Sequence, residues 1–83
     1  KNKMDKKIKK LSDHYIVCGG GETGRHVINE LTISHERVVL IENDDENIER
    51  CVGMEDNLLY IKGDATEDEN LVTAGIDKAA GIV

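Results

Sequence analysis

The sequence predicts an α/β fold in which a parallel sheet carries helices on both faces, with the strand order 3-2-1-4. Short apolar runs alternate with stretches of helical periodicity along the 83 residues, which indicates repeated β-α units. Connections of this kind are right-handed and join parallel strands. The chain also has no Phe, Trp or Pro, so its core must be aliphatic, and such cores suit strands that are buried on both faces.

The first unit of the chain combines a strand, a glycine cluster and a helix. We expect the strand over residues 14–18, where an apolar run ends at the glycines. The helix should extend from about residue 22 to residue 32, because Val27, Ile28 and Leu31 recur at helical spacing.

The second unit begins with a strand over residues 37–42, whose middle is continuously apolar. A helix is expected over residues 44–53, with Asp44 or Asp45 as its N-cap and Gly53 as its stop. The residues expected on its inner face are Ile48, Cys51 and Val52.

The third unit contains a strand over residues 57–62 and a short helix over residues 67–74, which Gly75 should end. A fourth strand is expected to begin within residues 79–83. Because a doubly wound sheet continues beyond its fourth strand, we expect this chain to be the first half of such a domain. The residues expected on the inner face of the short helix are Leu71, Val72 and Ala74.

The charge is distributed unevenly. The net charge of −6 combines +5 over residues 1–10 with −11 over residues 11–83. Residues 1–11 are interpreted as a Lys-rich leader or linker, which is a solvated tail, a segment beside a membrane, or a remnant of cloning. Residues 12–83 are the expected nucleotide-binding domain, and their acidity argues against a nucleic-acid partner.

The glycine cluster after the first strand has the form G-x-G-x-x-G, which makes the predicted sheet Rossmann-like. Gly19 would form the tight turn, Gly21 would let the backbone approach a pyrophosphate, and Gly24 would let the helix pack against the strand. We predict that the whole turn, including Gly20, Glu22 and Thr23, binds the phosphates. Thr23 could donate its hydroxyl to a phosphate, whereas the Glu22 carboxylate would repel one unless it faces solvent, is offset by Arg25 or acts through a cation.

Two further carboxylates follow the next two strands. Glu42 lies 23 residues after Gly19, where dinucleotide-binding folds place the carboxylate that binds the adenosine ribose. A carboxylate there favours NAD or a plain adenine nucleotide over NADP. Asp64 could accept from the adenine amino group or cap the next helix. Asn43 and Ala65, the neighbours of these carboxylates, complete the predicted adenosine site.

The remaining reactive side chains do not form a recognisable catalytic or metal site. Cys18 and Cys51 lack metal-type spacing and are interpreted as buried apolar residues rather than a disulfide. His14, His26 and His35 are scattered and are assigned to structure or surface. We therefore predict no catalytic residue, no metal site and no enzyme activity. One alternative is the cofactor-binding half of an NAD-dependent oxidoreductase, which would need a substrate domain. The other is a domain that uses the fold only for assembly and has an inactive pocket.

Two segments of the sequence carry a resemblance to a known family. The first extends from Leu11 to the glycine turn, and the second combines Gly63-Asp64-Ala65-Thr66 with Ala74-Gly75-Ile76. Together they resemble the RCK or KTN domains, also called TrkA-N domains, which regulate potassium conductance and transport. The Lys-rich leader before Asp13-His14-Tyr15 is similar to RCK domains that directly follow a pore helix in potassium channels.

The resemblance implies a cytoplasmic regulatory domain that is attached to or associated with the cell membrane. Its partners would be a channel pore or transporter membrane subunit and further copies of itself, in a homodimer or a ring. It would bind NAD(H), AMP, ADP or ATP to gate ion flux, with phosphate on Gly19, Gly21 and Gly24, ribose on Glu42, and adenine near Asp64 and Ala65. The family often has a basic residue where this chain has Glu22. This departure argues against tight binding of a dinucleotide pyrophosphate and leaves room for a mononucleotide or a weakened site.

Overall fold

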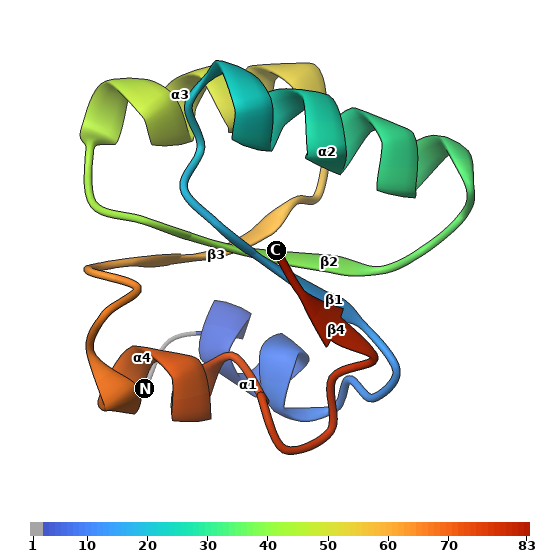
Figure 1. Ribbon diagram of the computed structural model, residues 1–83, viewed down its shortest axis with the longest axis vertical. Helices are drawn as coiled ribbons and strands as arrows, with labels where there is room; N and C mark the ends of the chain where they lie inside the picture. The colour runs from blue at the N-terminus through green and yellow to red at the C-terminus, as the bar shows by residue number, and fades with distance from the viewer. Residues whose placement is uncertain (1–2) are drawn as a thin grey trace.

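The computed structural model describes residues 3–83 as three layers, in which a parallel sheet lies between two pairs of helices (Figure 1). The strands follow one another across the sheet in the order β3-β2-β1-β4, and every pairing is parallel. The predicted fold class and strand order are thereby confirmed. The elements are α1 (Lys3–Lys9), β1 (Tyr15–Cys18), α2 (Glu22–Ile33), β2 (Val38–Glu42), α3 (Asp45–Met54), β3 (Leu59–Lys62), α4 (Asp68–Thr73) and β4 (Gly81–Ile82).

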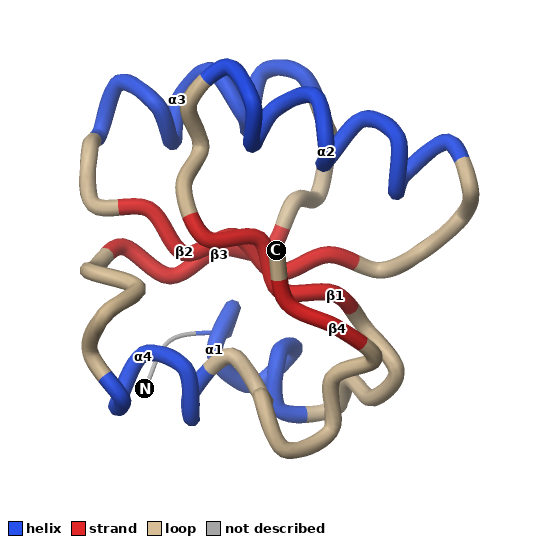
Figure 2. Tube along the Cα trace, viewed as in Figure 1, coloured by secondary structure: helices blue, strands red, loops and turns tan. Residues whose placement is uncertain are grey.

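The register of the sheet brings the carboxyl ends of its three longer strands to one edge. Cys18 of β1 pairs with Ile41 of β2, and Glu42 at the end of β2 pairs with Lys62 of β3. The loops that leave β1, β2 and β3 therefore start side by side. Figure 2 shows these strands in the middle layer, with α2 and α3 on one face and α1 and α4 on the other.

Successive side chains along each strand enter opposite layers of the core, as the two-residue period of a strand requires. Ile16 packs towards α1 and α4, whereas Val17 packs towards α2 and α3. In β2, Val39 and Ile41 belong to the first layer, and Val38 and Leu40 belong to the second. A strand buried on both faces explains why β2 reads as an unbroken apolar run.

The Lys-rich segment is the largest correction to the predicted architecture. A Lys-rich leader or linker was expected over residues 1–11, with a solvated tail as one interpretation, but residues 3–9 form α1, and Ile8 is completely buried. Leu11 is also buried, and the Met4 sulfur accepts the backbone N–H of Tyr60 at 3.2 Å. Expectations for residues 1–2 lie outside the described residues. Met4, Ile8 and Leu11 follow helical spacing and form an apolar stripe. The surrounding lysines make this stripe hard to recognise in the sequence.

Smaller corrections concern helix ends and faces. Gly53 does not stop α3, which continues to Met54, and Asp44 is the N-cap without a side-chain cap hydrogen bond. Val52 is exposed, because α3 rests on β2 and β3 and buries only the stripe that contains Ile48 and Cys51. Val72 is 69% exposed, because the short α4 presents Leu71 and Ala74 to the core and Val72 lies about 100° away from Leu71 around the helix.

The end of α4 follows the prediction more closely. Gly75 has φ +80, and its N–H donates to the carbonyl of Val72 while the N–H of Ile76 donates to that of Leu71. These two hydrogen bonds form a Schellman motif, which needs the left-handed conformation that glycine adopts without strain. The buried His14 ring lies against this turn, and its Nε2 is 2.7 Å from the carbonyl oxygen of Ala74.

Candidate functional site

The glycine turn leads directly from β1 into α2. Gly19 has φ +104, so the backbone adopts a conformation that favours glycine at this point. A Cβ at Gly24 would lie 1.9 Å from the carbonyl oxygen of Gly19, so only glycine lets the helix approach the turn this closely. Gly21 is the N-cap of α2 and makes no side-chain cap hydrogen bond. The first amides of α2 consequently have no side-chain partner at their cap.

The peptide of Gly20 is held from both sides. Its N–H donates to Glu42 Oε1, and its carbonyl oxygen accepts from Arg25 Nη1 at 3.0 Å. The Cys51 thiol lies 3.6 Å from the same oxygen. Gly20 is itself buried between Cys51 and Glu42, where an added Cβ would come within 3.0 Å of the Cys51 sulfur. The turn is therefore fixed by side chains from α2, β2 and α3.

Glu42 joins the glycine turn to the start of α3. Its Oε2 accepts the backbone N–H groups of Asn43 at 3.0 Å and Asp44 at 2.8 Å. Partial burial raises the pKa of this carboxyl, but hydrogen bonds from Gly20, Asp44 and the Asn47 side chain outweigh burial and hold the pKa below its usual value. Glu42 thus remains a charged acceptor, with lone pairs for a further donor.

Asp64 follows β3 and organises the next loop. Its Oδ1 accepts the backbone N–H of Thr66 at 2.9 Å and the Thr66 hydroxyl at 2.8 Å, and these bonds lower the pKa of the exposed Asp64 carboxyl. Glu67, rather than Asp64, is the N-cap position of α4. Asp64 therefore caps the turn before the helix, and its second carboxylate oxygen is not used in these bonds.

Two adjoining pockets lie at this edge of the sheet. The turn pocket has a volume of about 370 Å³ and the strand-end pocket about 240 Å³, and both are lined by Cys18 and Gly19. The turn pocket is further lined by Val17, Gly21, Glu22, Thr23, Gly24, Val27 and Val83. The strand-end pocket is further lined by Ile41, Glu42, Asn43, Gly63, Asp64 and Ala65.

The structure brings the predicted site residues together. Nine of the ten line one of these two pockets, and Gly20 lies buried behind them. Sequence reasoning missed Cys18, which was expected to be buried but is exposed and lines both pockets because it is the last residue of β1. Ile41 and Gly63 were also missed, although their positions beside Glu42 and Asp64 could have indicated them. Val83 joins the site because β4 pairs with β1, which the sequence does not show locally.

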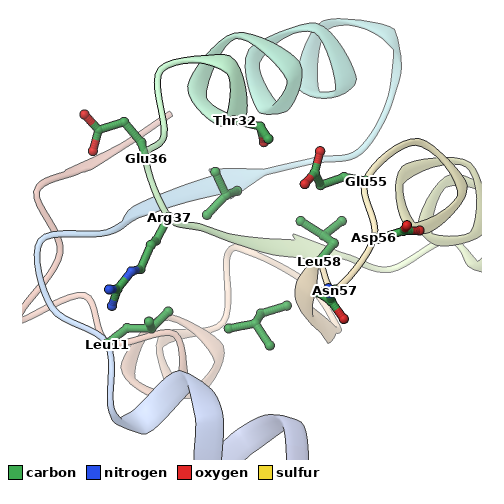
Figure 3. Close-up of a pocket in the computed structure, with 10 residues that line it drawn as sticks. Leu11, Thr32, Glu36, Arg37, Glu55, Asp56, Asn57 and Leu58 are labelled. Atoms are coloured by element: carbon green, nitrogen blue, oxygen red, sulfur yellow. The ribbon is translucent and has the colours of Figure 1, made fainter.

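A separate pocket lies at the opposite edge of the sheet and is lined by Leu11, Thr32, Arg37, Val38 and neighbouring loop residues (Figure 3). Its volume is about 180 Å³, and none of the predicted site residues lines it. Glu36, Glu55 and Asp56 make much of its rim acidic.

Within residues 3–83, no group of three or more His, Cys, Asp or Glu side chains is arranged to hold a metal ion. No helix in this part of the chain combines the length and the apolar character needed to span a bilayer. Both cysteines are free thiols.

Comparison with known proteins matches the model of the TrkA-N domain to residues 15–83. Potassium channel protein 1 of Methanocaldococcus jannaschii is 40% identical over 81 residues, and probable potassium channel protein 2 of the same organism is 42% identical over 82 residues. An uncharacterized protein of Methanothermus fervidus is 35% identical over 81 residues. Each match covers 98% of this chain, but the chain spans only 24% of the two channel relatives and 13% of the third.

Proposed function

This chain belongs to the TrkA-N domain family, and we propose that it is a cytoplasmic regulatory domain of a potassium channel or transporter. TrkA-N domains are Rossmann-type nucleotide-binding domains, which agrees with the parallel sheet and the glycine turn. The names of the two Methanocaldococcus relatives favour a channel over a transporter as the protein that contains this domain. In this proposal the domain works as a homodimer or larger ring, and its partner is a membrane pore.

The proposed ligand is NAD(H) or an adenine nucleotide, namely AMP, ADP or ATP. The observation that carries this proposal is the convergence of three features at the carboxyl ends of adjacent strands: the uncapped start of α2, the Glu42 carboxylate and the Asp64 loop. Open parallel sheets bind ligands at this edge. Phosphate would meet the amides of the turn, the ribose hydroxyls would donate to Glu42, and adenine would lie near Asp64 and Ala65.

The proposed mechanism is a shift between two arrangements of the domain within its assembly. A nucleotide that binds one arrangement more tightly increases the population of that arrangement and so changes the state of the pore. The shift can be no larger than the difference between the two binding free energies. Glu42 is the residue through which ligand binding would change the neighbouring elements, because its carboxylate contacts both the glycine turn and the residues that precede α3.

Calorimetric titration of the full-length protein with NAD⁺, NADH, AMP and ATP tests the proposal. We expect binding that Glu42→Ala weakens by about tenfold or more, since a charged acceptor for the ribose is lost. Glu49→Ala is the matched control, because Glu49 is an exposed residue of α3 outside both pockets. Absence of binding to all four ligands at millimolar concentration would refute nucleotide sensing, and equal affinity of the two variants would remove Glu42 from the site.

A further inference from the structure

The two pockets of the proposed nucleotide site have an unusual balance of charge for a phosphate ligand. Three of their lining residues are carboxylates, namely Glu22 and Glu42 beside the glycine turn and Asp64 after β3. None of the described lining residues is Lys, Arg or His. A nucleotide would therefore place its phosphates where the protein supplies backbone amides but no cationic side chain.

Two basic side chains of the adjoining elements have other contacts. Arg25 belongs to α2, but its guanidinium donates to the Gly20 carbonyl at 3.0 Å, and Arg25 lines neither pocket. Lys62 ends β3, and its Nζ lies 3.0 Å from Asp45 Oδ1. The alternative that Arg25 offsets Glu22 thus has no direct contact to support it in the described structure.

Glu22 is the carboxylate closest in sequence to the predicted phosphate position. It is the first residue of α2, it is exposed, and it lines the turn pocket. The start of a helix contributes roughly half of a positive charge, and a carboxylate in the first turn opposes its attraction for an anion. The Glu22 carboxylate therefore repels each phosphate that a ligand adds at this end of the site, by an amount that salt reduces.

Building on the proposed nucleotide site, we propose that it discriminates among adenine ligands by charge and that Glu22 determines this specificity. Ligands with few negative charges, such as AMP and NAD⁺, bind in preference to ADP and ATP. The backbone amides of the turn bind the single phosphate of AMP or the pyrophosphate of NAD⁺, which is esterified at both ends. The Glu22 carboxylate repels the additional charges of a longer phosphate chain.

The test is a titration of the full-length protein with AMP, ADP and ATP at low ionic strength and without divalent cations, which would mask phosphate charge. We expect affinity to fall about two- to fivefold with each added phosphate, and to fall less at high salt. Glu22→Gln should reduce the ratio of ATP to AMP dissociation constants by about threefold or more, because it removes the carboxylate with little change of shape.

The matched control is Glu36→Gln, which makes the same change of net charge at the opposite edge of the sheet, beside the pocket in Figure 3. It should leave the ratio unchanged. Wild-type protein that binds ATP as tightly as AMP would overturn the charge preference while leaving nucleotide sensing intact. A ratio that Glu22→Gln does not change, or that Glu36→Gln changes equally, would overturn the role of Glu22. Failure of every nucleotide to bind would instead refute the proposed function itself.

Discussion

The peptide of Gly20 contacts side chains from three elements, α2, β2 and α3. Its N–H donates to Glu42 and its carbonyl accepts from Arg25, so two oppositely charged side chains fix the orientation of one peptide plane. Hydrogen bonds to charged groups are stronger than neutral ones, contributing about 1.5–3 kcal/mol each. The glycine turn is therefore preorganised before a ligand arrives, which reduces the conformational entropy that is lost on binding.

The close approach of Gly24 to Gly19 leads to a prediction about stability. Gly24→Ala should lower the free energy of unfolding by about 1–3 kcal/mol, because its Cβ would lie 1.9 Å from a backbone oxygen that cannot move aside freely. Gly53→Ala is the control, since Gly53 also lies in a helix but has no neighbouring atom within 4 Å. It should gain up to about 1 kcal/mol from helix propensity.

Urea unfolding, followed by circular dichroism, measures both glycine variants. Equal stability of Gly24→Ala and wild-type protein would mean that α2 can shift away from the turn without cost. Such a result would contradict the close packing of helix and strand that the glycine motif predicts.

At the level of elements, the sequence pattern predicted each strand and helix from β1 onward, since the strands are short apolar runs and the apolar residues of the helices recur at helical spacing. The sequence also assigned ten candidate site residues to the carboxyl ends of parallel strands, which share an edge, and nine of them line the two pockets there. It failed where a residue's environment depends on a distant partner. The burial of Ile8 was not predicted from its Lys-rich surroundings, because Ile8 packs against Ile16 and Val39, which are distant in sequence. Cys18 reads as apolar but ends its strand at an open pocket.

The burial of α1 leads to a prediction about this element. Ile8→Ala should lower the free energy of unfolding by about 2–5 kcal/mol, because a completely buried side chain leaves a cavity in the layer beneath the sheet. Ile33→Ala removes the same atoms from a side chain that is 65% exposed, so it should change stability by about 0.5 kcal/mol or less.

Thermal and urea unfolding of the two isoleucine variants distinguish a structural helix from a solvated leader. Equal effects of the two substitutions would show that α1 opens independently of the sheet. A cooperative loss of stability in Ile8→Ala alone would show that the Lys-rich segment belongs to the folded unit.

On the scale of the whole molecule, the parallel sheet separates two different edges. The carboxyl edge holds the glycine turn, Glu42 and Asp64, whereas the opposite edge holds the acidic pocket around Glu36 and Glu55 (Figure 3). Both edges are hollowed and acidic, so neither pocket volume nor charge alone identifies a binding site. Backbone geometry distinguishes the two edges, because the N-terminus of α2 lines a pocket at the carboxyl edge.

This polarity predicts where a ligand changes the dynamics of the domain. Saturating AMP should slow amide hydrogen exchange in residues 19–24, 42–45 and 63–66, since a bound nucleotide restrains the loops that leave the three strands. Residues 32–37 and 55–58 at the opposite edge should exchange at their ligand-free rates, apart from any uniform slowing that global stabilisation produces. Hydrogen-exchange mass spectrometry on the full-length protein resolves these segments. Protection confined to residues 32–37 and 55–58 would place the ligand in the acidic pocket and would contradict a site built on the glycine turn, even if calorimetry detected binding.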